Sequence, residues 1–160
     1  MSNDEKCDVK SVVFVCTGNS CRSVMAEGFM RKCIENRTDI EVTSCGTSAI
    51  AGQLPSQNAV EVLKCHGINM SDHLARPLDH SIVKCADLLV TMTNQHKEHI
   101  LYLYSDVENI NLKTKLLTEF SLDESIKNQG IPDPVGMPYA HYQKCLEVMI
   151  DPIKNLCEQI

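Results

Sequence analysis

Residues 11–16, SVVFVC, limit the possible folds of this chain more than any other segment. They are β-branched, aromatic or apolar almost throughout, which indicates a strand buried on both faces, as in a parallel sheet. The turn residues TGNS follow directly, and apolar residues then recur at helical spacing from Met25 to Ile34. A buried strand, a tight loop and a helix in this order predict an α/β fold.

The remaining chain repeats this alternation. Further strands are expected at residues 40–44, 87–92 and 112–117. Helices are expected at residues 55–66, 79–85, 94–104 and 139–157, with a long polar loop at 119–138. Pro55 suits a first helical turn, and Asn94 suits a helix cap. We therefore expect a doubly wound, mostly parallel sheet with helices on both faces. The pattern indicates a single domain over residues 1–160 that starts with a flexible N-terminus at 1–10.

The composition excludes several classes of protein. The chain has 160 residues and a formal net charge of −6, so a general nucleic-acid binder is not expected. The longest apolar run is five residues, too short for a bilayer, and the first ten residues carry no secretory signal. Nine cysteines without a C-x-x-C spacing are typical of reduced thiols rather than a zinc or thioredoxin site. These features predict a cytoplasmic protein without membrane contact, bound metal or cofactor.

The loop at residues 16–23, CTGNSCRS, carries the strongest functional signal. In a doubly wound sheet, ligands bind at the carboxyl ends of the strands, where this loop is expected. Its backbone N–H groups and the helix N-terminus favour a phosphate-like dianion, which Arg22 can hold with its forked guanidinium. Gly18 is expected to supply a backbone conformation that other residues resist. Cys16 lies in the same field and is expected to be largely a thiolate, placed as an in-line nucleophile toward phosphorus.

Other side chains of the loop have supporting tasks in this hypothesis. The Ser23 hydroxyl can donate to the sulfur of Cys16, and Asn19 can lock the loop through hydrogen bonds to the backbone. Thr17 and Ser20 are expected to contribute mainly their backbone amides. A buried cysteine followed by an exposed arginine would explain the spacing alone, but not the Gly, Asn and Ser between them.

A thiol–phosphate mechanism also needs an acid to protonate the leaving group. Asp133 stands between Pro132 and Pro134 in the long loop, and the two prolines restrict its backbone. Asp-Pro on its own is more typical of a plain turn, so this assignment depends on the nucleophile loop. Asp123 and Glu124 lie in a less constrained stretch. Asp133 is therefore the expected acid.

Motifs along most of the chain point to one known family. The chain contains, in order, CTGNSCRS, MAEG, SCGTSA, HGINMSDHLARPL, ADLLVTMT and Asp133-Pro134. This order resembles the low-molecular-weight protein tyrosine phosphatases, and it implies a four-stranded parallel sheet of the phosphotyrosine protein phosphatase I type. The resemblance also implies Cys16 as nucleophile, Arg22 as phosphate clamp, Asn19 and Ser23 as loop support, and Asp133 as general acid and then general base. The implied chemistry is metal-free and passes through a cysteinyl phosphate.

The resemblance implies a hydrolase that removes phosphate from tyrosine in proteins, with phosphorylated proteins and a phosphate-like oxyanion as ligands. A protein-arginine phosphatase branch is the alternative, because its loop reads CTGN-Thr-CRS and Ser20 keeps that hydroxyl. Tyrosine phosphatases of this family often carry aromatic residues at positions that are occupied here by Ile50, Val135 and Gly136. The aromatic residues nearest to the acid are Tyr139 and Tyr142. Without aromatic walls, the pocket favours a slimmer or more polar substrate side chain.

Two other functions resemble parts of this pattern. Thiol-coupled arsenate reductases have the similar loop CTGNSCRSQMAEG, but they need a relay pair of cysteines after the third strand, where TMTNQHKEHI has none. A catalytically silent phosphate-binding module would not need Cys16, Arg22 and Asp133 together. In this family a cysteine at the position of Cys21 can form a reversible disulfide with the nucleophile. A redox role for Cys21 therefore stands beside a plain packing role.

Two pairs of histidines lie in or near expected functional segments. His96 and His99 are three residues apart on an expected helix, but no third ligand of suitable spacing accompanies them. A solvated helix face is thus expected rather than a metal pair. His66 and His73 flank a loop near the expected site, where they could pack or tune its charge. For the assembly, the sequence leaves a monomer or a weak dimer as the expectation.

Overall fold

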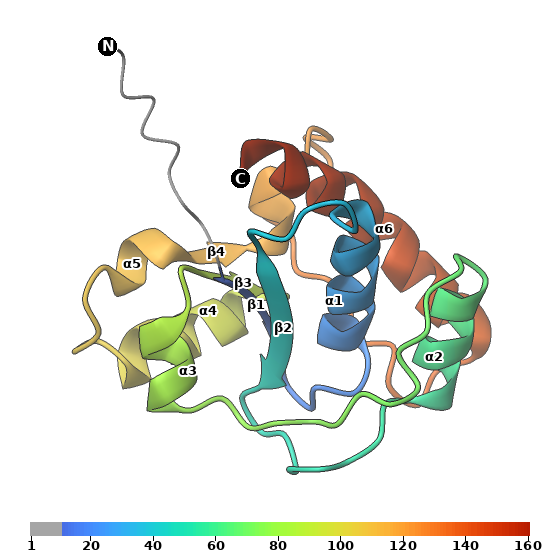
Figure 1. Ribbon diagram of the computed structural model, residues 1–160, viewed down its shortest axis with the longest axis horizontal. Coiled ribbons are helices and arrows are strands. Elements are labelled where there is room, and N and C mark those ends of the chain that lie inside the picture. Colours follow the sequence, from blue (N-terminus) through green and yellow to red (C-terminus); the bar gives the residue numbers. More distant parts are fainter. Residues whose placement is uncertain (1–10) are drawn as a thin grey trace.

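The computed structural model describes residues 11–160, so the flexible N-terminus expected at 1–10 lies outside the described residues. The strands are β1 (Ser11–Cys16), β2 (Glu41–Gly46), β3 (Leu88–Thr91) and β4 (Thr114–Leu116). The helices are α1 (Arg22–Cys33), α2 (Gln57–Lys64), α3 (His80–Cys85), α4 (Asn94–Leu103), α5 (Ile110–Lys113) and α6 (Tyr139–Gln159), with a 3-10 helix η1 (Leu117–Phe120). Their arrangement in space is shown in Figure 1.

The four strands form one parallel sheet in the order β2-β1-β3-β4. β1 is paired with β2 on one side and with β3 on the other, so the strand order reverses at β1. Such a reversal opens a crevice at the carboxyl ends of the two central strands, where α/β folds bind their ligands. The predicted α/β fold with a four-stranded parallel sheet is confirmed, and the loop of residues 16–23 lies at this crevice.

The sheet is covered on both faces, as expected from the unbroken apolar pattern of β1. Figure 1 shows α1, α2 and α6 on one side and α3, α4 and α5 on the other. Val12 and Phe14 of β1 belong to the core on the side of α1 and α6. Val13 and Val15 belong to a second core with residues of α3 and α4. Because all four side chains are buried, β1 is a rigid support for the loop that follows it.

Two expected helix starts differ in the structure. The cap of α4 is Thr93, whose Oγ1 accepts a hydrogen bond from the backbone N–H of His96 at 3.3 Å. Asn94 is already the first helical residue, whereas a capping residue needs the extended backbone that Thr93 has. The first residue of α2 is Gln57, so Pro55 precedes the helix instead of lying in its first turn.

Two short elements next to β4 were not expected from the sequence. α5 and η1 flank this strand, which has three residues and not the six of the expected range. Elements of four residues are too short to show a periodic pattern, so the sequence could not indicate them. Among the helices of residues 11–160, none combines the length and the apolar character needed to cross a membrane.

Candidate active site

The loop of residues 16–23 connects the carboxyl end of β1 to the first turn of α1. Cys16 is buried at the end of β1, and its Sγ lies 2.9 Å from Oγ of Ser23. The segment after β2 supports the loop, since the N–H of Thr47 donates to the carbonyl of Cys16 at 2.9 Å. The N–H of Ser48 donates to the carbonyl of Thr17 at the same distance. These bonds fix the first two peptide groups of the loop.

Asn19 has the unusual backbone conformation in this loop. It is fully buried, and its φ of 53° lies in the left-handed region. Its Nδ2 donates to Oγ of Ser23 at 2.9 Å and to Oγ of Ser44 at 2.8 Å. Its Oδ1 accepts from the backbone N–H of Arg76 at 3.0 Å and lies 3.2 Å from Nε2 of His73. Both hydrogens and both lone pairs of the amide are therefore engaged.

The expectation that Gly18 provides the special backbone geometry is wrong. Gly18 lies in the loop, but its φ is not positive, and a Cβ there would lie 3.5 Å from Oγ of Ser20, an ordinary contact. Gly46, at the end of β2, is the glycine that the site requires. A Cβ at Gly46 would meet the carbonyl oxygen of Thr17 and would lie 2.9 Å from the backbone N of Asn19. The close approach of β2 to the loop thus depends on Gly46.

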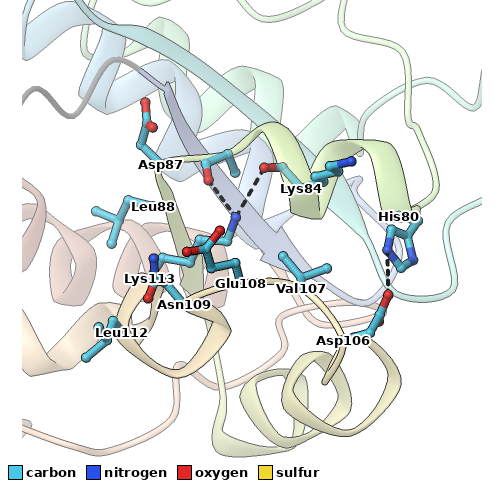
Figure 2. Close-up of a pocket in the computed structure, with 11 residues that line it drawn as sticks. His80, Lys84, Asp87, Leu88, Asp106, Val107, Glu108, Asn109, Leu112 and Lys113 are labelled. Atoms are coloured by element: carbon cyan, nitrogen blue, oxygen red, sulfur yellow. Dashed lines mark hydrogen bonds and ion pairs between the residues drawn. The ribbon is translucent and has the colours of Figure 1, made fainter.

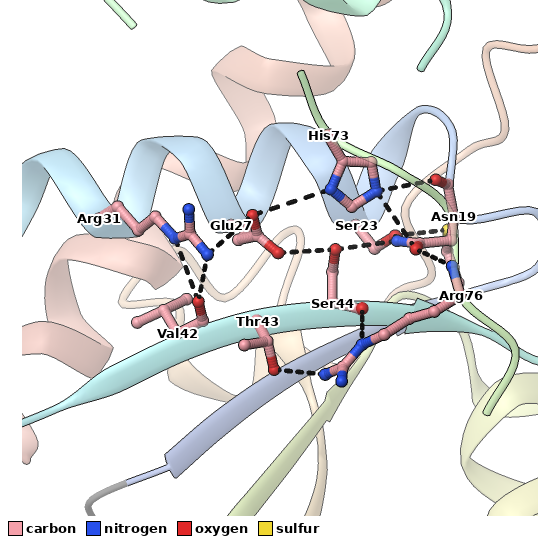
Figure 3. A network of polar contacts seen from close by, with 10 residues as sticks. Asn19, Ser23, Glu27, Arg31, Val42, Thr43, Ser44, His73 and Arg76 are labelled. Carbon is pink, nitrogen blue, oxygen red and sulfur yellow. Dashed lines mark hydrogen bonds and ion pairs between the residues drawn. The ribbon is translucent and has the colours of Figure 1, made fainter. Parts of the chain in front are cut away.

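A buried polar network extends from Asn19 along α1 (Figure 3). Oγ of Ser44 donates to Oε1 of Glu27 at 2.9 Å. Oε2 of this buried carboxylate lies 3.3 Å from Nη2 of Arg31 and 4.0 Å from Nδ1 of His73. The sequence reasoning did not identify Glu27 or Ser44, although they belong to the MAEG and SCGTSA segments. Both segments were recognised as family motifs, but the sequence does not show that Glu27 of one contacts Ser44 of the other.

Arg22 connects the start of α1 to the loop that carries Asp133. One Nη of this buried guanidinium donates to the carbonyl of Ile131 at 2.9 Å, and the other lies 3.5 Å from Oδ2 of Asp133. The backbone N–H of Ile131 donates to the carbonyl of Met92 at 2.8 Å, just after β3. Half of the Asp133 side chain is exposed. Thr17, Arg22 and Asp133 line one cavity of about 370 Å³.

Cys21 is a buried residue of the loop, and its side chain faces α6. Its Sγ is 3.6 Å from Oγ of Ser20 and donates to Oη of Tyr142 at 3.7 Å. Oη of Tyr142 also accepts from Oγ of Ser56 at 3.1 Å. Burial raises the pKa of the Cys21 thiol, against the opposing effect of these hydrogen bonds. Cys145 of α6 is close by, and its Sγ donates to the carbonyl of Pro132 at 3.8 Å.

His96 does not lie on a solvated helix face, contrary to expectation. It is buried, and its Nε2 lies 2.8 Å from Oγ1 of Thr17. Its Nδ1 lies 3.0 Å from Oγ1 of Thr93. Burial, followed by the charge of Arg22, lowers the pKa of His96 to about 4. The helical spacing of His96 and His99 does not reveal this burial, because the first turn of α4 packs against the loop of residues 16–23 instead of facing water.

A second cavity, of about 780 Å³, lies away from this loop (Figure 2). It is found near the amino end of β3, opposite to the crevice, and its walls come from α3, α5 and the segment before α5. Nζ of Lys113 donates to the carbonyls of Val83 at 2.6 Å and Ala86 at 2.9 Å, so it closes the end of α3. Nε2 of His80 lies 3.0 Å from Oδ2 of Asp106. Lys113, His80 and Asp106 are thus engaged in contacts within the protein.

The structure therefore brings the predicted residues together at one crevice. Cys16, Asn19 and Ser23 are joined by hydrogen bonds, while Arg22 and Asp133 face each other across the mouth. Within residues 11–160, no three His, Cys, Asp or Glu side chains are grouped so that they could hold a metal ion. All eight cysteines in the described part of the chain are free thiols.

Comparisons with known proteins agree with this geometry. A family model described as low molecular weight phosphotyrosine protein phosphatase matches residues 11–160. The structure of a low molecular weight protein tyrosine phosphatase from T. tengcongensis is 38% identical with a TM-score of 0.84, covering 94% of this chain and 99% of that one. An arginine phosphatase from Geobacillus stearothermophilus is 31% identical with a TM-score of 0.83, covering 93% and 91%. An arsenate reductase of Staphylococcus aureus is 28% identical, covering 91% of this chain and 95% of that protein.

These matches extend over nearly the whole described chain, and the resemblance seen in the sequence is confirmed. Cysteine-based phosphatase chemistry is general to the family that this model describes. The chain belongs to the low molecular weight phosphotyrosine protein phosphatase family.

Proposed function

We propose that this protein is a cysteine-dependent phosphatase that hydrolyses phosphotyrosine in proteins. The thiolate of Cys16 attacks phosphorus, the bond from phosphorus to the ester oxygen breaks, and Asp133 gives its proton to that oxygen. Water then attacks the phosphorus of the cysteinyl phosphate while Asp133 accepts its proton. The Cys16 thiolate leaves, and inorganic phosphate is released.

The contact of 2.9 Å between Sγ of Cys16 and Oγ of Ser23 is the observation that carries this proposal. Oγ of Ser23 already accepts a hydrogen bond from Nδ2 of Asn19, so its own hydrogen is free to point at the sulfur. A hydroxyl that donates to sulfur stabilises the thiolate over the thiol, both as nucleophile and as leaving group. A cysteine that only packs in the core would not need a hydroxyl that donates a hydrogen bond to its sulfur.

Oxyanion binding is assigned to the loop and to the first residue of α1. Arg22 starts that helix, where the backbone dipoles favour an anion, and its guanidinium can pair with two phosphate oxygens. The backbone N–H groups proposed to contact the remaining oxygens belong to Thr17, Gly18, Asn19, Ser20 and Cys21. A phosphoryl group in this cradle would lie within reach of both Cys16 and Asp133, because Asp133 is paired with Arg22.

Phosphoarginine is the second candidate substrate, and the position of two tyrosines favours it. Tyr142 is buried, with its hydroxyl on Cys21 and Ser56, so its ring does not form a wall of the mouth. Oη of Tyr139 lies 3.5 Å from Sγ of Cys65, at the end of α2. A phenyl ring gains from stacking on aromatic walls, which these tyrosines do not supply.

The arsenate reductase alternative is not favoured by the arrangement of the thiols. The segment directly after β3 contains no cysteine, and Cys85 precedes β3 at the end of α3. A relay from Cys16 would then depend on Cys21, which we propose as a partner for a protective disulfide.

The free thiols of the described chain support a reducing compartment, and we propose a cytoplasmic protein that acts as a monomer or weak dimer.

The experiment that tests this function compares phosphotyrosyl and phosphoarginyl forms of one peptide, with release of inorganic phosphate as the readout. Wild type is expected to hydrolyse the phosphotyrosyl form, and Cys16→Ser is expected to lose turnover while still binding inorganic phosphate. Normal turnover by Cys16→Ser would exclude the nucleophile. If the hydroxyl of Ser20 favours arginine, Ser20→Ile should shift the preference toward tyrosine, and an unchanged preference would remove that part of the argument.

A further inference from the structure

His96 bridges two threonines and has no task in the reaction proposed above. Its ring lies between Oγ1 of Thr93 at 3.0 Å and Oγ1 of Thr17 at 2.8 Å. Thr93 caps α4, whereas Thr17 follows the nucleophile directly. The ring therefore joins the first turn of one helix to the wall of the active site.

The hydrogen-bond partners of His96 favour one position for the hydrogen on its ring. Oγ1 of Thr93 already accepts from the backbone N–H of His96. A hydrogen on Nδ1 would occupy the second lone pair of the same oxygen and would leave the hydrogen of the half-buried Thr93 hydroxyl without an acceptor among residues 11–160. The consistent assignment has Thr93 donating to Nδ1, and Nε2–H donating to Oγ1 of Thr17. The lowered pKa of the ring, about 4, agrees with a neutral imidazole.

This direction leaves the hydroxyl hydrogen of Thr17 available. Thr17 is exposed, and within residues 11–160 its Oγ1 has Nε2 of His96 as its hydrogen-bond partner. One lone pair accepts from His96, so the hydrogen and the second lone pair remain for another group. Thr17 lines the same 370 Å³ cavity as Arg22 and Asp133. The free hydroxyl thus borders the cavity between Arg22 and Asp133, where we expect the leaving group of a substrate.

We propose that the Thr17 hydroxyl, held in place by His96, hydrogen-bonds the substrate beside the scissile bond and selects leaving groups that carry N–H. This inference rests on the proposed phosphatase function and on its second candidate substrate, phosphoarginine, and it names the residue pair that would favour that substrate over phosphotyrosine. Thr17 would contact the substrate, and His96 would act as a positioning residue. The backbone role expected for Thr17 from the sequence then accounts for only part of its contribution.

The chemistry of the two candidate leaving groups explains the direction of the selection. A phosphorylated guanidinium has N–H groups next to the phosphorus, and these need acceptors once water is displaced. Oγ1 of Thr17 offers its second lone pair as such an acceptor, in the wall of the cavity that Asp133 also lines. A phenyl ring offers no such hydrogen, so it would cover the Thr17 hydroxyl without satisfying it.

The test uses wild type, Thr17→Val and the matched control Thr17→Ser on phosphoarginyl and phosphotyrosyl forms of one peptide. Valine keeps the shape of threonine without its hydroxyl, whereas serine keeps the hydroxyl. The ratio of kcat/KM for the phosphoarginyl over the phosphotyrosyl peptide should fall about tenfold in Thr17→Val, the size of one hydrogen bond. Thr17→Ser should keep the ratio within about threefold of wild type.

His96→Leu should lower the same ratio, and the double variant with Thr17→Val should fall no further, since both changes remove one contact. Thermal unfolding and binding of inorganic phosphate check that each variant is folded. If His96→Leu does not fold, the Thr17 variants decide the question alone.

Equal losses on both peptides in Thr17→Val would overturn the specificity role while the phosphatase function stands. If wild type hydrolyses only the phosphotyrosyl peptide, the specificity role is likewise overturned and the phosphatase function stands. A wild type that hydrolyses neither peptide would instead refute the proposed function, and the inference with it.

Discussion

Replacing Asn19 by alanine tests how much the buried network contributes to the fold. The substitution removes four hydrogen bonds and leaves an alanine at a φ of 53°. In the left-handed region an alanine costs about 1 kcal/mol or more. Ser23 and Ser44 are buried, and each hydroxyl that loses a partner costs about 1 kcal/mol at the low end of the usual range. The free energy of unfolding should therefore fall by about 3 kcal/mol, a large share of a typical domain's stability.

Asn128→Ala is the matched control, because it changes the backbone term alone. Asn128 has a φ of 64° and is exposed, so alanine there meets the same backbone strain without a buried network. Urea unfolding of both variants should show Asn19→Ala to be less stable than Asn128→Ala by about 2 kcal/mol. Turnover of an aryl phosphate should fall in Asn19→Ala, since Asn19 also orients Ser23.

Equal losses of stability in the two variants would refute this reasoning. Asparagine at position 19 would then matter only because it tolerates a positive φ, and its hydrogen bonds would contribute nothing measurable to the free energy of unfolding. The argument that Ser23 is turned toward Cys16 would lose its support as well, because it depends on the bond from Asn19 to Ser23.

Three further predictions follow from the same geometry. Gly46→Ala should lose more stability in urea than Gly18→Ala, because only at Gly46 does the new Cβ meet backbone atoms; the reverse order would contradict the contact. Asp133→Ala should slow phosphate esters with poor leaving groups about 100-fold more than activated aryl esters, and equal slowing in steady-state assays would remove the acid role. His96 has a pKa of about 4 when folded and 6.5 when unfolded, so the stability due to its neutral ring is complete above pH 6.5 and is lost as the pH falls toward 4. Between pH 7.5 and 4.5 wild type should lose more stability than His96→Gln, by about 1–2 kcal/mol, since solvent screens part of the charge. Parallel curves for the two proteins would exclude a buried neutral ring.

The sequence could predict those parts of the fold and site that are local in the chain. β1, the loop of residues 16–23 and α1 are contiguous, and the residue types of each segment favour its structure without help from elsewhere. β1 begins and ends where expected, because its side chains are buried on both faces and the pattern is unbroken. Asp133 could be identified because two prolines mark its position.

Contacts between distant segments could not be predicted in this way. Ser44, His73 and Arg76 meet Asn19 only after β2 and the segment before α3 have packed beside the loop. His96 was placed on a solvated face because helical spacing alone does not show which turn is covered by another segment. A glycine inside a loop, such as Gly18, is a familiar signal, whereas the need for Gly46 arises from the close approach of β2 and is visible only in three dimensions.

The buried carboxylate of Glu27 contributes more to the orientation of the hydrogen bonds at the site than to the stability of the fold. Glu27 is buried on α1, where an unpaired carboxylate would be strongly destabilising. An apolar residue would be the simpler choice for the core. The contact of Glu27 with Arg31 compensates the charge, and its bond from Ser44 uses the hydroxyl hydrogen. Oγ of Ser44 must then act as an acceptor toward Asn19, so the direction of every hydrogen from Glu27 to the sulfur of Cys16 is determined. Donors that are oriented before the substrate arrives need no rearrangement during the reaction, which is the condition for strong electrostatic stabilisation of a thiolate and a phosphoryl group.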